Sequence, residues 1–251
     1  MNNYFPFTEK TRLADLIHQD YKLIPVIGRF GIKFGFGNKT VSEVCRDYNI
    51  NKWFFLEIIN SFHNSNYFPT EELQHFSAQT MVSYLSNTHA WYLNVKVPEI
   101  EDSINEMKRL APNEDIKNIK LISDFFQEYK NELVIHLDEE DSKVFPYIIS
   151  LEKSLEMGVF DKELIRKIQN ESIEEYERNH DNLEVKLADL KNLIIKYLPP
   201  VSSYDSCQRL LIELFRLEAD IENHTRIEEK VLVPKVKLLE QEIIQISGAG
   251  K

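Results

Sequence analysis

Two stretches of the sequence carry a His and a Glu four residues apart: His136-Leu-Asp-Glu-Glu140 and His224-Thr-Arg-Ile-Glu228. On an α-helix, such residues share one face, with their Cβ atoms about 5–6 Å apart, so that each pair can bind one metal site together. Two single histidines, His89 and His180, complete a set of six donors. Six imidazole and carboxylate donors are too many for one tetrahedral ion and suit two ions bridged by carboxylates.

The four histidines recur at nearly equal steps along the chain. From the N-terminus, the steps between successive members are 47, 44 and 44 residues. Two His/Glu pairs alone are weak evidence in a chain this rich in Glu, so the spacing is the stronger argument. Antiparallel helices would bring all four imidazoles to one level of an up-down-up-down bundle, where such bundles hold metal sites. Three breaks divide the steps almost evenly: Ala111-Pro112-Asn113, Met157-Gly158 and Pro199-Pro200.

The elements that must hold these donors are four helices within residues 70–242. Their expected ranges are 77–110, 114–151, 161–197 and 204–240. Pro98, Pro146 and Pro234 fall inside three of them and must kink or interrupt the helix. The third is expected to be the most regular. Pro146 and Pro234 each stand six residues after the Glu of a His-x-x-x-Glu pair, which marks the second and fourth helices as pseudo-repeats.

Residues 1–69 are expected to form a small helical domain of their own. Helices are predicted over 8–28, with Thr8 as the N-cap, over 41–47 and over 51–63. Three glycines in Phe30-Gly-Ile-Lys-Phe-Gly-Phe-Gly-Asn38 predict a turn with positive φ rather than a nucleotide-binding loop, because no strand precedes it. Residues 64–69 are interpreted as a linker and 243–251 as a frayed tail.

Composition places the chain in the all-α class. With 251 residues, 43% of them hydrophobic, it can bury a core, and its seven glycines and 28% charged residues favour helices. No apolar run is long enough for a membrane span and no secretory signal is visible, so the protein is expected in the cytoplasm. Cys45 and Cys207 are far apart and are interpreted as buried, inert thiols.

The acidic charge belongs to the second part of the chain. Residues 1–69 hold eight Lys/Arg and six Asp/Glu, whereas the remainder holds 22 and 35. An acidic bundle repels phosphate backbones, which disfavours nucleic acid as a partner. The helices at 41–47 and 51–63 have the outline of a helix-turn-helix, but the second is apolar where a recognition helix is basic.

With the pattern His89, His136-x-x-x-Glu140, His180 and His224-x-x-x-Glu228, the sequence resembles hemerythrin-like di-iron proteins of the repair of iron centres family. The resemblance covers nearly the whole chain and implies a small helical N-terminal domain followed by a four-helix hemerythrin-like bundle. It implies a non-haem centre of two iron ions, oxo- or hydroxo-bridged. The four histidines would be terminal ligands, and Glu140 and Glu228 would bridge the ions.

The resemblance also implies a role: family members are linked to the repair of iron-sulfur clusters damaged by nitric oxide or peroxide. One departure stands in the N-terminal domain. The family pattern has adjacent cysteines where this chain has Gly35 and Phe36, so a route that uses those thiols is absent here. The partners implied are O₂, NO or peroxide as small ligands and iron-sulfur proteins as iron acceptors. No membrane is expected as a partner, and a homodimer is left open.

Other titratable residues are weighed against this set. Glu184 follows His180 by four residues and makes a third pair, but it is left outside the predicted ligands because surface glutamates are common in this chain. Glu132, one turn before His136, is interpreted as a supporting or pathway residue. Three further histidines fall outside the spacing and are interpreted as surface or locally bonded: His18, His63 and His75.

Three functions follow from the residues. The first is di-iron stress protection, by iron supply to damaged clusters or disposal of nitric oxide. Histidine-rich ligation favours a centre that reversibly meets O₂, NO or peroxide, or gives up iron, over one that drives hydroxylation. The second is a non-enzymatic O₂ or NO sensor that signals through residues 1–69, and the third is a metal-free bundle. Manganese and zinc accept the same donors.

Overall fold

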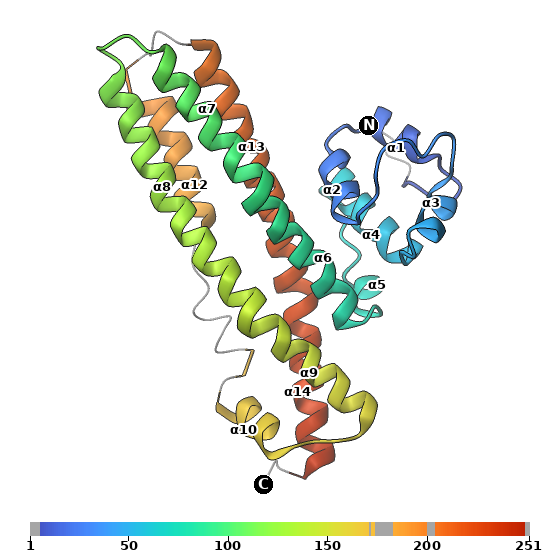
Figure 1. Cartoon of the computed structure of the whole chain (residues 1–251). Coiled ribbons are helices and arrows are strands. Elements are labelled where there is room, and N and C mark those ends of the chain that lie inside the picture. The colour runs from blue at the N-terminus through green and yellow to red at the C-terminus, as the bar shows by residue number, and fades with distance from the viewer. Residues whose placement is uncertain (1–5, 171, 174–182, 200–203, 249–251) are drawn as a thin grey trace.

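The computed structural model describes residues 6–170, 172–173, 183–199 and 204–248. Within those ranges the chain is helical, and its nearest approach to a strand is the isolated bridge between Arg12 and Thr40. Long helices run side by side, and a group of short N-terminal helices packs against one flank (Figure 1). The all-α class expected from the sequence is confirmed.

Five short helices come first: α1 (Leu13–Gln19), α2 (Leu23–Arg29), α3 (Val41–Asp47), α4 (Lys52–His63) and α5 (Thr70–Gln74). A capping box starts α3, because the Thr40 hydroxyl accepts from the backbone N–H of Glu43 while the Glu43 carboxylate accepts from the backbone of Thr40. Asn51 caps α4 through its side-chain oxygen. The ranges predicted for these two helices agree with the structure to within one residue.

The single helix predicted over residues 8–28 is wrong, because the chain forms α1 and α2 there. After α1, the Asp20 carboxylate accepts a hydrogen bond from the backbone N–H of Lys22 at 3.1 Å, which closes a turn. Thr8 precedes both helices and caps neither, since Arg12 occupies the position before α1. Pro25 falls in the first turn of α2, where its missing N–H costs no helical hydrogen bond.

The glycine-rich segment after α2 forms the predicted turn. Gly31, Gly35 and Gly37 have φ values of +76°, +95° and +63°. A side chain with a Cβ is disfavoured at all three angles, so these positions depend on glycine. The turn returns the chain to α3, which packs on α4.

Four long rods follow, each assembled from shorter helical pieces. The first is α6 (Ala78–Trp91), η1 (Tyr92–Lys96) and α7 (Val97–Leu110). The second is α8 (Ile116–Glu139), η2 (Glu140–Val144) and α9 (Phe145–Met157). The described part of the third is α12 (Leu183–Asn192) and η3 (Leu193–Tyr197), and α10 (Lys162–Asn170) comes before it in the chain. The fourth is α13 (Tyr204–Ile227), η4 (Glu228–Leu232) and α14 (Val233–Ser247).

Each rod contains a five-residue π-helical segment that ends two residues before a proline. A proline has no N–H, and its ring crowds the carbonyl four residues back, which favours the wider turn. Two of the segments begin at Glu140 and Glu228, so the pseudo-repeat seen in the sequence has a backbone basis. The residue ahead of each proline donates its N–H to the carbonyl five positions earlier: Val97 to Tyr92, Phe145 to Glu140, Leu198 to Leu193 and Val233 to Glu228.

The third helix, predicted over 161–197 as the most regular, is interrupted at residue 172, and residues 171 and 174–182 of that range lie outside the described part of the chain. The α-helix α10 ends at Asn170, and residue 172 has no helical assignment. The backbone N–H of Ile173 donates to the Glu240 carboxylate of α14 at 3.0 Å, a bond that a continuous helix would make within itself. Leu164 and Ile168 of α10 are buried at the end of the bundle where α14 lies.

Two apolar clusters fill the described core. The proximal cluster joins residues 7–85, 145–173 and 227–243, and so runs from the N-terminal helices into the α9–α14 end of the bundle. The distal cluster joins residues 92–137 and 183–221 at the α7–α8 end. The boundary between the clusters crosses three rods, after residues 85, 137 and 221, which is where His89, Glu140 and His224 stand. The domain boundary after residue 69 stays a prediction.

No helix within the described ranges is long and apolar enough to cross a membrane.

Candidate metal centre

Four of the predicted donors meet between the two apolar clusters. Each of His89, Glu140, His224 and Glu228 offers one ligand atom, and these atoms all lie within 4.8 Å of one another. All four residues are buried. They come from α6, η2, α13 and η4, that is, from the first, second and fourth rods.

The distances within this group are those of donors that share a cation. His89 Nε2 lies 3.2 Å from His224 Nε2. The same His89 nitrogen lies 3.3 Å from Glu140 Oε2, and His224 Nε2 lies 3.0 Å from Glu228 Oε1. Two imidazoles and two carboxylates converging in a buried volume form the donor set that iron, manganese or zinc accepts.

His136 adjoins the group through Glu140. Its Nε2 lies 3.3 Å from Glu140 Oε1, and its side chain is 11% exposed. Glu140 thus directs one oxygen to His89 and the other to His136, so its carboxylate adjoins both histidines. His136 itself is outside the group of four.

One predicted ligand and one further candidate lie outside the described part of the chain. His180 lies outside the described residues, and so does the side chain of Glu184. Glu132 forms an ion pair with Lys186 of α12 and is not one of the four clustered donors. The full set of six ligands therefore stays a prediction, of which five members lie in the described part of the chain.

The donor chemistry fits a bound cation. A buried carboxylate is costly unless it is paired, hydrogen-bonded or bound to a metal, and Glu140 and Glu228 are 1% and 5% exposed. Burial lowers the pKa of His89, which keeps its imidazole neutral, the form that binds a metal ion. A divalent cation between these groups would offset both carboxylate charges.

Comparison with known proteins agrees with this reading. A family model described as "Hemerythrin HHE cation binding domain" matches residues 99–236. The chain belongs to this family. Its helical bundle is accordingly a hemerythrin-like bundle, and the match contains His136, Glu140, His180, His224 and Glu228. His89 lies before the matched range of this hemerythrin HHE chain. Its place among the donors is therefore known from the structure and not from the family match.

A distant relative extends over the N-terminal helices as well. The "Iron-sulfur cluster repair protein ScdA" of Staphylococcus haemolyticus (strain JCSC1435) is 17% identical over 230 residues, which is 91% of this chain and 98% of that protein. No solved structure gave a significant match. The hemerythrin HHE assignment therefore depends on the family model and on the arrangement of the donors.

Asp141 is a site residue that the sequence reasoning missed. Its Oδ2 lies 3.1 Å from Nδ1 of His89, the ring nitrogen turned away from the other donors. Burial raises the pKa of Asp141, but His89, Ser86 and His224 together outweigh this and lower it overall. The Ser86 hydroxyl donates to Oδ1 at 2.8 Å. A carboxylate on the far nitrogen fixes the tautomer and orientation of a ligating histidine. An acidic residue directly after Glu140 was the available signal.

Aromatic rings wall the hemerythrin HHE centre. The ring of Phe145 stacks on His89 with centroids 5.3 Å apart and an interplanar angle of 20°. Tyr92 stands edge-on to His224 at 5.8 Å and donates its hydroxyl to Asp220 Oδ1 at 2.8 Å. Both rings are buried, so the His89–His224 contact lies in surroundings of low dielectric constant, which strengthen electrostatic interactions there.

The remaining histidines behave as expected from their spacing. His63 lies 2.9 Å from Asp20 Oδ2 through Nδ1, far in the sequence from the cluster, and His18 and His75 are exposed. Cys45 is buried, and burial raises the pKa of its thiol to about 11, which makes it unreactive near neutral pH. Cys207 is only partly buried, so the expectation of a buried thiol is wrong at this position, although burial raises its pKa.

Proposed function

We propose that this protein holds a non-haem di-iron centre and acts in the response to oxidative or nitrosative stress, by supplying iron to damaged iron-sulfur clusters or by handling nitric oxide. The observation that carries the proposal is the convergence of His89, Glu140, His224 and Glu228 within 4.8 Å, with His136 on the second oxygen of Glu140. A metal-free bundle would have no reason to bury these groups together.

In this proposal each donor has a defined part. His89, His136, His180 and His224 would hold the ions through their imidazoles, and Glu140 and Glu228 would hold them through their carboxylates. Asp141 orients His89, and Phe145 and Tyr92 keep water from the enclosed side. When bound, the ions supply a site for O₂, NO or peroxide, or iron that can be handed on. Four histidines to two carboxylates leave few anionic donors, which favours reversible binding and release.

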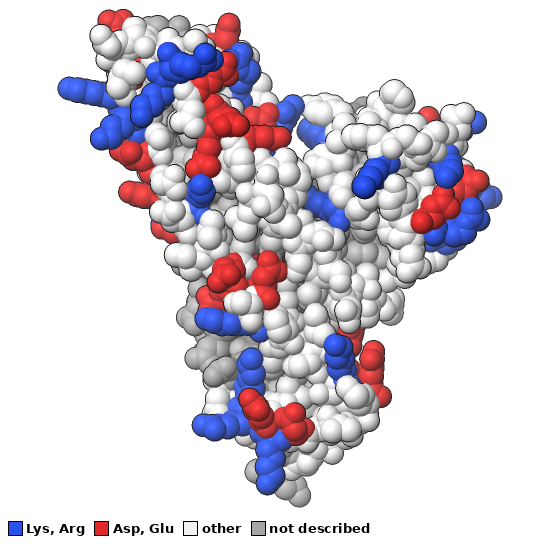
Figure 2. Space-filling model, viewed as in Figure 1, with Lys and Arg blue, Asp and Glu red and all other residues white. Residues whose placement is uncertain are grey.

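The stress-response role is supported by the name of the relative, a cluster repair protein, at 17% identity. Iron-sulfur proteins are the proposed iron acceptors. Because Gly35 and Phe36 stand where the resembling family has cysteines, hand-off in this chain would rely on the bundle. Basic side chains on the face drawn in Figure 2 stand beside acidic ones, and a surface of that kind does not favour nucleic acid as the partner.

The test is the iron content and optical spectrum of aerobically isolated protein. We expect two irons per chain and a ligand-to-metal absorption that His136→Ala and Glu228→Ala each abolish or alter. His75→Ala and Glu229→Ala, at exposed positions, are matched controls and should leave both unchanged. If either ligand variant keeps two irons with an unaltered spectrum, the ligand assignment is wrong.

Function beyond iron binding is tested on a cluster enzyme inactivated with nitric oxide. Restored activity on addition of the iron-loaded chain, but not of the Glu228→Ala variant, would support repair. The second candidate is an O₂ or NO sensor that signals through the N-terminal helices. The buried ion pair between Arg29 of α2 and Asp220 of α13 favours it, because it joins those helices to the rod that carries His224. Ligand binding without restored activity would support the sensor.

A further inference from the structure

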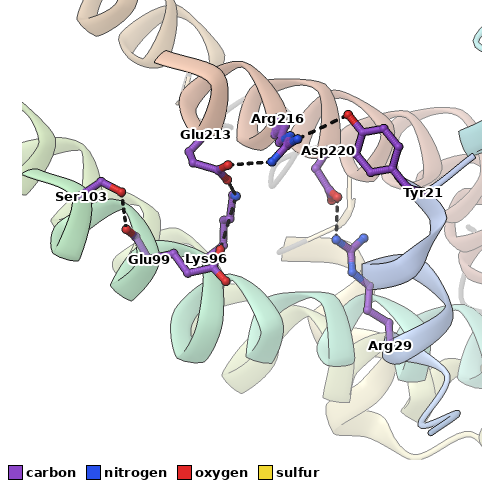
Figure 3. A network of polar contacts seen from close by, with 8 residues as sticks. All are labelled: Tyr21, Arg29, Lys96, Glu99, Ser103, Glu213, Arg216 and Asp220. Carbon is purple, nitrogen blue, oxygen red and sulfur yellow. Dashed lines mark hydrogen bonds and ion pairs between the residues drawn. The ribbon is translucent and has the colours of Figure 1, made fainter. Parts of the chain in front are cut away.

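Arg29 is the last residue of α2, and its side chain enters the bundle. It is 4% exposed, and its Nη2 donates to Asp220 Oδ2 at 2.6 Å (Figure 3). The guanidinium carbon lies 4.4 Å from the ring centre of Trp91. Burial by itself lowers the pKa of Arg29, but Asp220, Tyr84 and Tyr92 together raise it by more, so the group stays charged. A buried charge held by one carboxylate and aromatic faces is a specific contact between two parts of the chain.

Asp220 carries the contact to the metal-binding rods. It lies one helical turn before His224 on α13, and its second oxygen accepts from the Tyr92 hydroxyl at 2.8 Å. Tyr92 lies one turn after His89, and its ring stands edge-on to His224 at 5.8 Å. One carboxylate therefore joins α2, the rod of His89 and the rod of His224.

The backbone of Arg29 makes a second contact with the same rods. Its carbonyl accepts from Nδ2 of Asn87 at 2.9 Å, two residues before His89. The neighbouring Phe30 packs on Tyr84 of α6 with ring centroids 5.0 Å apart. Arg29 thus contacts α6 through its backbone carbonyl and α13 through its side chain. A shift of α2 must therefore either move these helices with it or break these hydrogen bonds.

From this arrangement, and resting on the proposed di-iron centre, we infer that Arg29 is a positioning residue through which the N-terminal helices set the His89–His224 side of the metal site. Arg29 does not touch a donor atom; it acts through Asp220 and Tyr92. The coupling is reciprocal, as linkage requires: docked helices tighten metal binding, and bound metal tightens the docking. Metal occupancy thereby changes how firmly the N-terminal helices are docked on the bundle.

A second contact between the same two parts of the chain provides the control. Nη2 of Arg216 on α13 lies 3.4 Å from the hydroxyl of Tyr21, and Arg216 continues to Glu213 and Lys96 (Figure 3). Tyr21 is 57% exposed, and Arg216 lies two turns before His224, so this contact leads away from the donors. Tyr21→Phe should weaken docking slightly and leave the metal site alone.

The experiment measures ferrous iron affinity of the full chain by anaerobic competition with a chelator. Coupling between two sites in a protein typically amounts to a factor of about 5–150. We expect Arg29→Gln to weaken iron binding at least about fivefold, and Tyr21→Phe to leave it within about twofold of the parent. Asp220→Asn keeps the shape of the side chain and should reproduce the loss. The double variant Arg29→Gln/Asp220→Asn should be no worse than either single one.

The reciprocal readout is hydrogen exchange of the backbone amides of residues 23–30. Iron should slow this exchange in the parent and in Tyr21→Phe, but not in Arg29→Gln. Unchanged iron affinity in a folded Arg29→Gln or Asp220→Asn variant, or exchange that ignores iron in the parent, overturns the inference and leaves the proposed function standing. A parent chain that binds no iron overturns both. If Arg29→Gln does not fold, Asp220→Asn and the parent exchange data decide.

Discussion

His136 and Glu140 occupy the end of α8 and the start of η2, and His224 and Glu228 occupy the end of α13 and the start of η4 in the same way. In both rods the π-helical segment begins at the Glu, and a proline stands six residues after that Glu. Two copies of one backbone device therefore deliver a His and a Glu to the same level of the bundle.

The surroundings of the two copies differ. The side chain of His224 is 5% exposed, its Nε2 lies 3.2 Å from His89 Nε2, and its ring stands against Tyr92, which donates a hydrogen bond to Asp220. His136 has 11% of its side chain exposed and contacts Glu140. By the exposure of the histidine side chain, the copy in the fourth rod is the more enclosed and the copy in the second rod is the more open. Metal affinity should follow this difference, because a ligand held in place loses less freedom on binding.

The largest effect should come from the enclosed copy. We expect His224→Ala to weaken ferrous iron binding by more than about 100-fold, beyond what residues that only orient ligands contribute. His136→Ala should weaken it less. Chelator competition and iron per chain after gel filtration measure both variants, with His75→Ala as the control. Equal losses of iron affinity for the two variants would mean that the burial of the histidine does not affect metal binding.

The next effect should come from Asp141, which supports His89 from the rod of the open copy. We expect Asp141→Asn to weaken iron binding by about 10–100-fold, the range for partners that orient a ligating histidine. Glu139→Gln is a suitable control, since Glu139 is exposed and pairs with Lys143 at 3.0 Å. An affinity equal to that of the control would show that the 3.1 Å contact with His89 has no part in metal binding.

The two prolines test what the copies share. Alanine at position 146 or 234 restores an N–H that can bond four residues back, so the π turn that begins at Glu140 or Glu228 can relax toward an α-helix. We expect Pro146→Ala and Pro234→Ala to weaken iron binding by similar, several-fold factors, about 1 kcal/mol each. The same competition assay applies. An effect at one proline alone would mean that packing, not the turn, places the carboxylates.

Much of the fold was available from the sequence because the bundle repeats itself. Regular steps between histidines, breaks with proline or glycine between them and prolines at matched offsets predicted the rods. The first agrees to within one residue, whereas the second and fourth continue six and seven residues past their predicted ends. One failure came from a local turn and the other from a tertiary contact. Asp20 accepts from the backbone N–H of Lys22 and closes a turn that divides the predicted first helix, a local signal that the helical pattern outweighed in the prediction. Glu240 accepts from the backbone N–H of Ile173, 67 residues before it, and no local residue pattern shows that contact.

The candidate site was predictable where one helix supplies both partners. His224 and Glu228, like His136 and Glu140, follow from a spacing of four on a helix face. Asp141 was missed, because its position beside His89 depends on how the second rod packs against the first. Arg29 was missed for the same reason: Asp220 stands 191 residues further along the chain, and no local spacing connects them.

The smallest expected effect concerns pH and the enclosed side. Burial lowers the pKa of His89 below its ordinary value of 6.5, whereas in the unfolded chain this imidazole takes up a proton near that value. The unfolded state thus binds more protons in the window below pH 6.5, so the unfolding free energy of chelator-treated protein should fall as pH drops through it. Urea unfolding at several pH values measures this slope. His89→Gln should flatten it and the exposed His75→Gln should not, and a slope equal in both variants would place the titrating group elsewhere.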